Sequence, residues 1–225
     1  MAKPKAAGEE LERLKRQIKN KEAGRLYFFF GEETFLLEYY LGQMKKLLLE
    51  ELTESFNFHR FTGETFDLTE FGEAVENLPM MAEHTLVQVD DIDPFKMNES
   101  DRDRMGAILS DIPDYCTVIF VYGGQGWKPD QRMKKLWEAV KKDGALVEFA
   151  KQDQRHLIDW LTRRFAAKGK KITPELCVYL IDITDGTMTS LLGEVEKICA
   201  YSGADTICQA DIDAVTEPVL DAMVF

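Results

Sequence analysis

The sequence predicts an α/β domain, built on a five-stranded parallel sheet with helices on both faces, followed by a small all-helical domain. Residues 1–150 alternate short apolar, β-rich runs with amphipathic helical patterns, and such alternation is typical of a parallel sheet with helical crossovers. After Phe149 the strand signal stops and four helical patterns follow. Apolar residues make up 45% of the 225, enough to bury a substantial core.

Five runs carry the strand signal. Residues 25–30 form a continuous apolar run that suits a strand buried on both faces, and residues 56–61 alternate aromatic and polar side chains. Residues 115–122 are the most β-rich run and predict a central strand. The five predicted strands are residues 25–30, 56–61, 85–89, 115–122 and 145–149.

Helical patterns fill the intervals between the strands and the whole of the second domain. Thr34, Asp67 and Thr173 are predicted N-caps, and Pro174 suits the first position of a helix. The helices predicted in the first domain are residues 8–22, 34–50, 67–77, 98–109 and 131–142. Those predicted in the second are residues 153–167, 174–183, 187–201 and 210–216.

Composition excludes several classes of protein. Four cysteines without a CxxC pair and three histidines offer no metal-ligand spacing and are typical of a reduced, cytoplasmic protein. No apolar run approaches the roughly 20 residues needed to span a bilayer, so no membrane partner is expected. No nucleophile stands out, and we predict no catalytic residue, no cofactor and no metal.

Charge is unevenly distributed along the chain. The net charge of −12 argues against a free-standing nucleic-acid binder, because phosphate binding needs an excess of Lys and Arg. Yet residues 128–171 hold thirteen basic and six acidic residues. Two interpretations stay open: a solvated basic face that pairs with acids elsewhere, or a patch that faces phosphate or an acidic partner.

An α/β domain followed by a small helical one is the layout of many nucleotide-driven ATPases, but the loop after the first strand lacks their signature. That loop, residues 31–36, has one glycine, no lysine and two carboxylates, Glu32 and Glu33, whereas ATPases carry GxxxxGK[ST]. An ATPase with an unrecognised phosphate site remains the alternative. Asp90 and Asp91 follow an apolar strand as magnesium-binding acids do, but without a phosphate loop a solvated acidic turn is the favoured interpretation.

One connection is unusually apolar. Leu78, Pro79, Met80 and Met81, here called the apolar segment, follow a predicted helix directly and precede a strand, where polar turn residues are normal. The two methionines either fill the core beneath the sheet or form an exposed knob that docks into a partner's pocket.

Three features in this order carry a family resemblance: GEETFLLEYY at residues 31–40, the apolar segment, and LLGEVEKI at residues 191–198. The chain resembles the delta subunit of the bacterial DNA polymerase III clamp loader. The resemblance implies an AAA+-like domain without a functional P-loop over residues 1–150 and a helical lid domain over residues 151–217. Residues 218–225 would begin a linker to a collar domain absent from this sequence.

The resemblance also implies a function. Such a subunit belongs to a DNA-directed DNA polymerase holoenzyme, a nucleotidyltransferase complex, and hydrolyses no ATP itself. It binds the ring-shaped sliding clamp, the beta subunit, and opens the ring during DNA replication. The clamp-binding positions correspond to Leu78, Pro79, Met80 and Met81. Many relatives carry Leu-Phe or Phe-Phe at the last two, so Met-Met keeps the apolar volume but loses the aromatic ring.

The remaining partners implied by the resemblance are the other clamp-loader subunits, reached through the collar domain, and DNA threaded through the full assembly. The candidate DNA-facing residues are Lys134, Lys135, Arg163, Arg164, Lys170 and Lys171. A generic α/β protein-interaction module without a role in replication is the third possibility.

Overall fold

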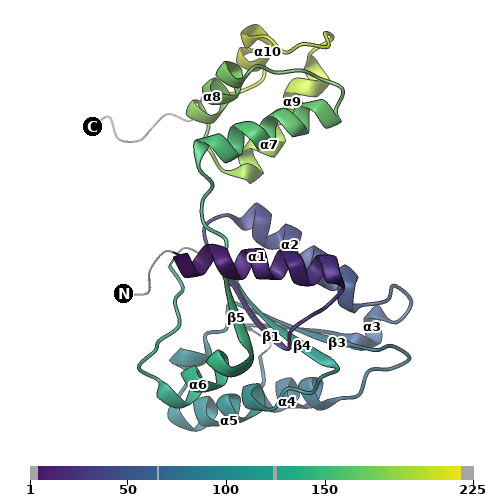
Figure 1. Ribbon diagram of the computed structural model, residues 1–225, viewed down its shortest axis with the longest axis vertical. Helices are drawn as coiled ribbons and strands as arrows, with labels where there is room; N and C mark the ends of the chain where they lie inside the picture. The colour runs from purple at the N-terminus through teal and green to yellow at the C-terminus, as the bar shows by residue number, and fades with distance from the viewer. Residues whose placement is uncertain (1–4, 65, 124–125, 219–225) are drawn as a thin grey trace. The chain divides into compact units, whose positions relative to one another are not determined.

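The computed structural model describes residues 5–64, 66–123 and 126–218. The chain divides into two compact units, Met1–Ala150 and Lys151–Phe225 (Figure 1). The first unit contains the sheet, and the second is built from helices.

The sheet of the first unit has five strands in the order β2-β3-β4-β1-β5, and every strand pair is parallel. The predicted parallel five-stranded sheet is therefore confirmed. The strands are β1 (Leu26–Phe30), β2 (Phe58–Thr62), β3 (Thr85–Asp90), β4 (Cys116–Tyr122) and β5 (Gly144–Glu148).

Helices cover both faces of this sheet. In Figure 1, α1 and α2 lie on one face, and α4, α5 and α6 lie on the other. The helices of the first unit are α1 (Lys5–Asn20), α2 (Thr34–Leu48), α3 (Glu54–Asn57), α4 (Leu68–Glu76), a 3₁₀ turn η1 (Pro94–Lys96), α5 (Glu99–Ser110) and α6 (Lys134–Asp143).

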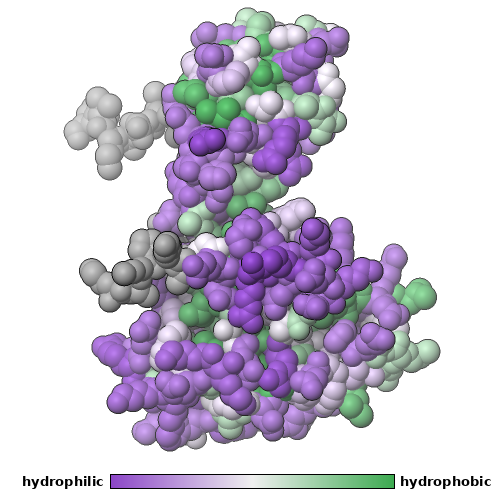
Figure 2. Space-filling model, in the orientation of Figure 1, coloured by the Kyte–Doolittle hydropathy of each residue, from purple (hydrophilic) through white to green (hydrophobic). Residues whose placement is uncertain are grey.

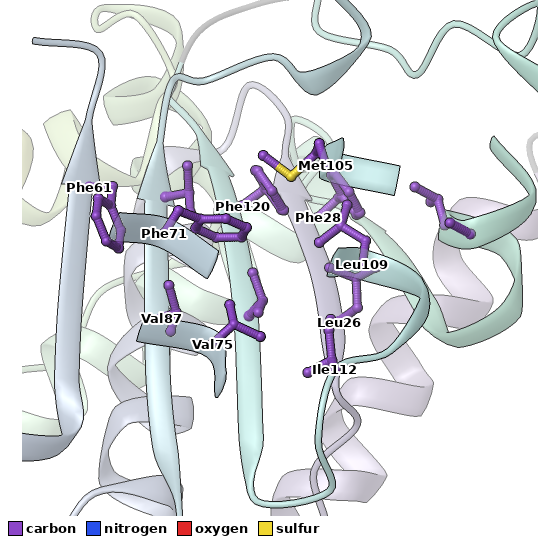
Figure 3. Close-up of a cluster of buried hydrophobic side chains, with 14 of the residues drawn as sticks. Leu26, Phe28, Phe61, Phe71, Val75, Val87, Met105, Leu109, Ile112 and Phe120 are labelled. Atoms are coloured by element: carbon purple, nitrogen blue, oxygen red, sulfur yellow. The ribbon is translucent and has the colours of Figure 1, made fainter. Parts of the chain in front are cut away.

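The continuous apolar run of β1 follows from its central place in the sheet. Leu26 and Phe28 join the core cluster under α4, α5 and α6, and Tyr27 and Phe29 join the cluster under α1 and α2. Both faces of the strand are therefore buried, so every position is apolar rather than every second one. Figure 3 shows Phe28 within the first of these clusters.

The second unit consists of α7 (Gln154–Ala167), α8 (Pro174–Asp182), α9 (Met188–Tyr201) and α10 (Gln209–Asp213). Asp153 and Thr173 cap the first two helices by accepting hydrogen bonds from backbone N–H groups. The apolar faces of these helices supply most of the buried apolar residues of the unit, which are Leu157, Leu161, Phe165, Cys177, Leu180, Met188, Leu191, Val195, Ile198 and Ile212; Ile172 and Ile207, in segments between helices, are also buried.

Two local predictions are wrong. Phe56 and Asn57 belong to α3 rather than to the strand, because the chain turns through one helical turn that begins at Thr53 and leaves Phe56 exposed. Thr34 is the first residue of α2 rather than its cap. The N-cap is Glu33, whose backbone N–H donates to the carbonyl of Phe149.

Two further predictions concern the chain's end and the membrane. Except for Pro218, the predicted linker lies outside the described residues. None of the helices in the described ranges has the length and apolar character that crossing a membrane requires.

Candidate docking site

The apolar segment connects α4 to β3, and three of its four side chains are exposed. Leu78 exposes 77% of its surface, Met80 54% and Met81 87%, while Pro79 is half-buried. The interpretation of the two methionines as core filler beneath the sheet is therefore wrong. Adjacent exposed apolar side chains of this kind mark interaction surfaces more often than single scattered ones do.

The backbone of the apolar segment is tied to α3 by one buried side chain. Asn57 accepts a hydrogen bond from the backbone N–H of Met80 through Oδ1 (2.7 Å) and donates from Nδ2 to the carbonyl of the same residue (3.0 Å). Only 1% of Asn57 is exposed. Sequence reasoning missed this residue, because its partner lies 23 positions along the chain and no local pattern joins them.

The helix that precedes the apolar segment is itself well anchored. Asp67 caps α4 by accepting from the backbone N–H groups of two residues in its first turn (2.8 and 2.9 Å), and these bonds lower the pKa of that carboxyl. Phe71 and Val75 are buried against the sheet. At the other end of α4, the Tyr115 hydroxyl donates to the carbonyl of Glu76 (2.8 Å). The apolar segment thus leaves the fold from a fixed position.

Two more exposed apolar side chains lie close to Asn57 in the chain. Leu52 exposes 92% of its surface and Phe56 58%. The hydrogen bonds of Asn57 bring this part of the chain beside Met80. Figure 2 shows hydrophobic residues gathered at the edge of the first unit where α3 lies.

The loop 31–36 is packed directly against the chain that follows β5. The N–H of Glu33 donates to the carbonyl of Phe149 (2.9 Å), and the N–H of Phe149 donates to the carbonyl of Phe30 (2.7 Å). Gly31 has φ +136°, and a Cβ placed on it would lie 2.2 Å from the carbonyl oxygen of Phe149. The start of the loop therefore lies against the protein's own backbone, and one of its N–H groups, that of Glu33, is already paired.

Glu33 occupies the N-terminal end of α2 with only 2% of its surface exposed. The N-terminus of a helix carries partial positive charge, and in phosphate-binding loops it faces the phosphate groups. Here the N-cap residue at that end is an acid, and its side chain makes no hydrogen bond to the backbone of the first turn.

The two acids at the C-terminal end of β3, Asp90 and Asp91, are bonded to other groups of the protein. Asp90 forms an ion pair with Arg60 and accepts from Gln88 (2.6 Å). Asp91 accepts from the N–H of Gly123 (3.2 Å). Within the described ranges, no group of three or more His, Cys, Asp or Glu side chains is placed to hold a metal ion. The solvated acidic turn stays the favoured interpretation, with Asp91 exposed and both acids bonded to the protein.

The candidate DNA-facing residues divide between the two units. Lys134 and Lys135 begin α6 in the first unit. Both are exposed, and Lys135 forms an ion pair with Asp103 (3.0 Å). At this exposure such a pair contributes little to stability, so the ammonium group remains available to a stronger anionic partner.

The other four belong to the second unit, and one already has a structural role. Lys170 donates from Nζ to two backbone carbonyls just beyond α9 (3.0 and 2.6 Å). Arg163 bonds a carbonyl of its own helix (3.1 Å), and Arg164 lies over the ring of Trp160. Lys171 is exposed. A DNA-facing role for these side chains stays a prediction.

Comparison with solved structures places the fold. A Bacillus subtilis DNA clamp loader delta protein matches 93% of this chain and 63% of its own, with a TM-score of 0.65 and 20% identity. The Thermotoga maritima RuvB Holliday junction branch migration motor matches 95% of this chain and 68% of its own, with a TM-score of 0.59 and 12% identity. The α/β unit and the helical unit that follows it thus have an AAA+-like fold, in which the loop 31–36 lacks the phosphate-loop signature.

Comparison of sequences identifies the family. The family model described as DNA polymerase III, delta subunit, matches residues 27–150, and the chain belongs to this family. The Bacillus subtilis DNA polymerase III subunit delta is 24% identical over 216 residues, which cover 93% of this chain and 62% of the relative. The chain thus spans less than two thirds of that relative's length.

Proposed function

We propose that this chain binds a sliding clamp through Leu78, Pro79, Met80 and Met81 and, within a complete clamp loader, opens the clamp ring. The observation that carries the proposal is an exposed apolar segment on a backbone that Asn57 holds in place. Family membership supports it, as does the likeness to a protein named as a DNA clamp loader delta protein.

The energetics of this docking follow from the exposure of the segment. Burying a large apolar side chain that is now exposed to water contributes about 1.5–3 kcal/mol to the free energy of binding, and a few such side chains carry most of the energy of an interface.

Binding by itself does not open the clamp ring. To open the ring, the chain must bind the open form of the clamp more tightly than the closed form.

Replacing both methionines with alanine is expected to weaken clamp binding on the order of 100-fold, since two central anchors are truncated together. The measurement is the Kd of the purified 225-residue chain for the cognate sliding clamp by surface plasmon resonance, with co-elution in gel filtration as a second readout.

The matched control is Tyr201→Ala, which removes an apolar side chain of similar exposure, 59%, from the second unit. We expect it to bind as the wild type does. Equal binding by the wild type and the Met80→Ala/Met81→Ala variant would exclude docking through the apolar segment.

We also propose that the chain hydrolyses no ATP. Two features of the loop 31–36 support this: the backbone N–H of Glu33 already donates to the carbonyl of Phe149, and the buried N-cap residue of α2, at the end where phosphates bind in P-loop proteins, is an acid, Glu33. A second carboxylate in the same loop, Glu32, would repel a polyphosphate further.

The alternative, an ATPase with an unrecognised phosphate site, makes the opposite prediction. Measuring ATP binding and hydrolysis therefore distinguishes the two hypotheses. We expect no saturable binding of labelled ATP at micromolar concentration and no phosphate release above that of a buffer blank. An ATPase with an intact GxxxxGK[ST] loop serves as the positive control. Micromolar binding with turnover would refute the non-catalytic proposal.

The remaining partners extend the same proposal. As a clamp-loader subunit the chain would work in the cytoplasm, assemble with the other subunits through a collar domain, and face DNA with part of its basic surface. The energy of ATP hydrolysis would then come from those other subunits.

A further inference from the structure

Asn57 contacts the apolar segment in an unusual way. Its side-chain amide pairs with both the N–H and the carbonyl of one residue, Met80, as a neighbouring peptide group would in a sheet. The orientation of the amide is determined by its partners, because the N–H of Met80 needs an acceptor and its carbonyl needs a donor.

The side-chain amide of Asn57 is itself fixed by a second partner, the carbonyl of Thr53. The second hydrogen of Nδ2 goes to the carbonyl of Thr53 (3.0 Å), and the backbone N–H of Asn57 donates to the same carbonyl (3.2 Å). Only 1% of Asn57 is exposed, and all its N–H groups donate to carbonyls of the protein. A buried amide satisfied on every side has one favourable position, and it imposes that position on Met80.

Met81, the residue after the one that Asn57 bonds, has an uncommon backbone conformation. Met81 has φ +53°, a left-handed conformation that residues other than glycine rarely adopt and that persists where neighbouring contacts impose it. Fixing Met80 fixes the point from which the chain enters this turn. The direction of the Met81 side chain, which is 87% exposed, is therefore set by the backbone rather than by contacts of the side chain.

We propose that Asn57 is a positioning residue that sets the conformation of the apolar segment before the clamp arrives; this inference rests on the proposed function. A ligand binds a partly populated conformation with an affinity reduced by the populated fraction. Pre-organising a loop therefore improves affinity without adding a contact. Asn57 acts through Met80 and Met81 rather than by touching the clamp.

The test is a cycle of variants measured by surface plasmon resonance against the cognate clamp. Asn57→Ala is expected to raise the Kd about tenfold, as it would if the competent fraction of the segment fell to about one tenth. In the Met80→Ala/Met81→Ala background the same change is expected to raise the Kd less than about twofold, because the side chains it positions are gone.

The matched control for a general loss of stability is Asn98→Ala. Asn98 caps α5 through an acceptor bond from the N–H of Asp101 (3.0 Å) and a donor bond to its carboxylate (2.7 Å), so its loss removes two side-chain hydrogen bonds, against three for Asn57→Ala. We expect wild-type clamp affinity. If Asn98→Ala weakens binding as much as Asn57→Ala, destabilisation explains both and the proposal is overturned.

A second variant gives a readout that a purely structural role would not move. Asn57→Asp keeps the acceptor for the N–H of Met80 but turns a carboxylate oxygen toward the carbonyls of Met80 and Thr53. Protonation restores a donor there, and burial raises the pKa of such a carboxyl. Relative to wild type at the same pH, Asn57→Asp should therefore recover affinity as the pH falls, while Asn57→Ala should not.

The outcomes separate the two proposals. If Met80→Ala/Met81→Ala binds as wild type, the docking proposal fails and this one fails with it. If that variant weakens binding but Asn57→Ala does not, only the positioning role is wrong. If Asn57→Ala does not fold by circular dichroism, the pH profile of Asn57→Asp decides, and a flat ratio to wild type overturns the proposal.

Discussion

Replacing Phe28 with alanine is expected to lower the free energy of unfolding of the first unit by about 4 kcal/mol. Phe28 is fully buried in the middle of β1. Its ring stacks on Phe120 with centroids 4.8 Å apart and on Trp127 with centroids 5.6 Å apart. Alanine removes both ring contacts and leaves a cavity that the flanking strands cannot close, because their positions are set by the sheet.

Urea unfolding, followed by far-UV circular dichroism and tryptophan fluorescence, measures this effect. Trp127 lies against the replaced ring, so its share of the fluorescence, beside those of Trp137 and Trp160, reports on this contact. Phe56→Ala is the matched control: it deletes the same atoms from a side chain that is 58% exposed, and it should change stability by no more than about 0.5 kcal/mol. Similar losses from both variants would contradict the central role of Phe28.

Replacing Gly31 with alanine is expected to cost at least about 3 kcal/mol, because two penalties act together. The backbone at Gly31 has φ +136°, which an L side chain adopts only with strain. The added Cβ would also lie 2.2 Å from the carbonyl oxygen of Phe149, so the backbone must move. That movement would break the hydrogen bonds that Phe149 makes with Phe30 and Glu33.

Gly42→Ala provides the matched control for this glycine. A Cβ at Gly42 meets nothing within 4 Å, and the residue lies within α2, where alanine is preferred over glycine by about 1 kcal/mol. The two substitutions should therefore shift the urea midpoint in opposite directions. A Gly31→Ala variant with the wild-type midpoint would show that the loop 31–36 can move away from Phe149.

Both predictions bear on the proposed function through one physical fact. The loop that would hold phosphate in an ATPase follows β1 and packs here against Phe149, which bonds the backbone of both Phe30 and Glu33. Any change that opened this loop for a nucleotide would have to break those bonds and expose Glu33. The fold thus has an AAA+-like architecture in which the loop 31–36 packs against the protein's own backbone.

Most of the fold was predictable because hydrophobic periodicity reports burial directly. The apolar run of β1 indicated a strand covered on both faces, and the core clusters confirm this. The pattern failed at Phe56 and Asn57, where alternating aromatic and polar residues resembled a strand although one helical turn places Phe56 in solvent. A four-residue helix is too short to show a period of its own.

The candidate site was only partly predictable. An apolar stretch where polar turn residues are expected identified Leu78, Pro79, Met80 and Met81, and the resemblance to clamp-loader delta subunits suggested their role. The same composition fitted core filler equally well, because apolarity does not say which side of the backbone a side chain faces. The basic residues were found by counting, but their contacts were not: Lys170 proved to bond two backbone carbonyls.

The sequence by itself determined the parallel sheet, the helical second unit, the absence of a phosphate-loop signature and the identity of the apolar segment. Each of these follows from a local pattern of residues or from composition. Only the tertiary structure decided that the methionines are exposed, that Phe149 bonds the backbone of the loop 31–36, and that Asn57 bonds the backbone of Met80. These are contacts between residues distant in the chain. Hydrogen bonds of that kind depend on where the completed sheet and helices place two backbones, which no local pattern encodes.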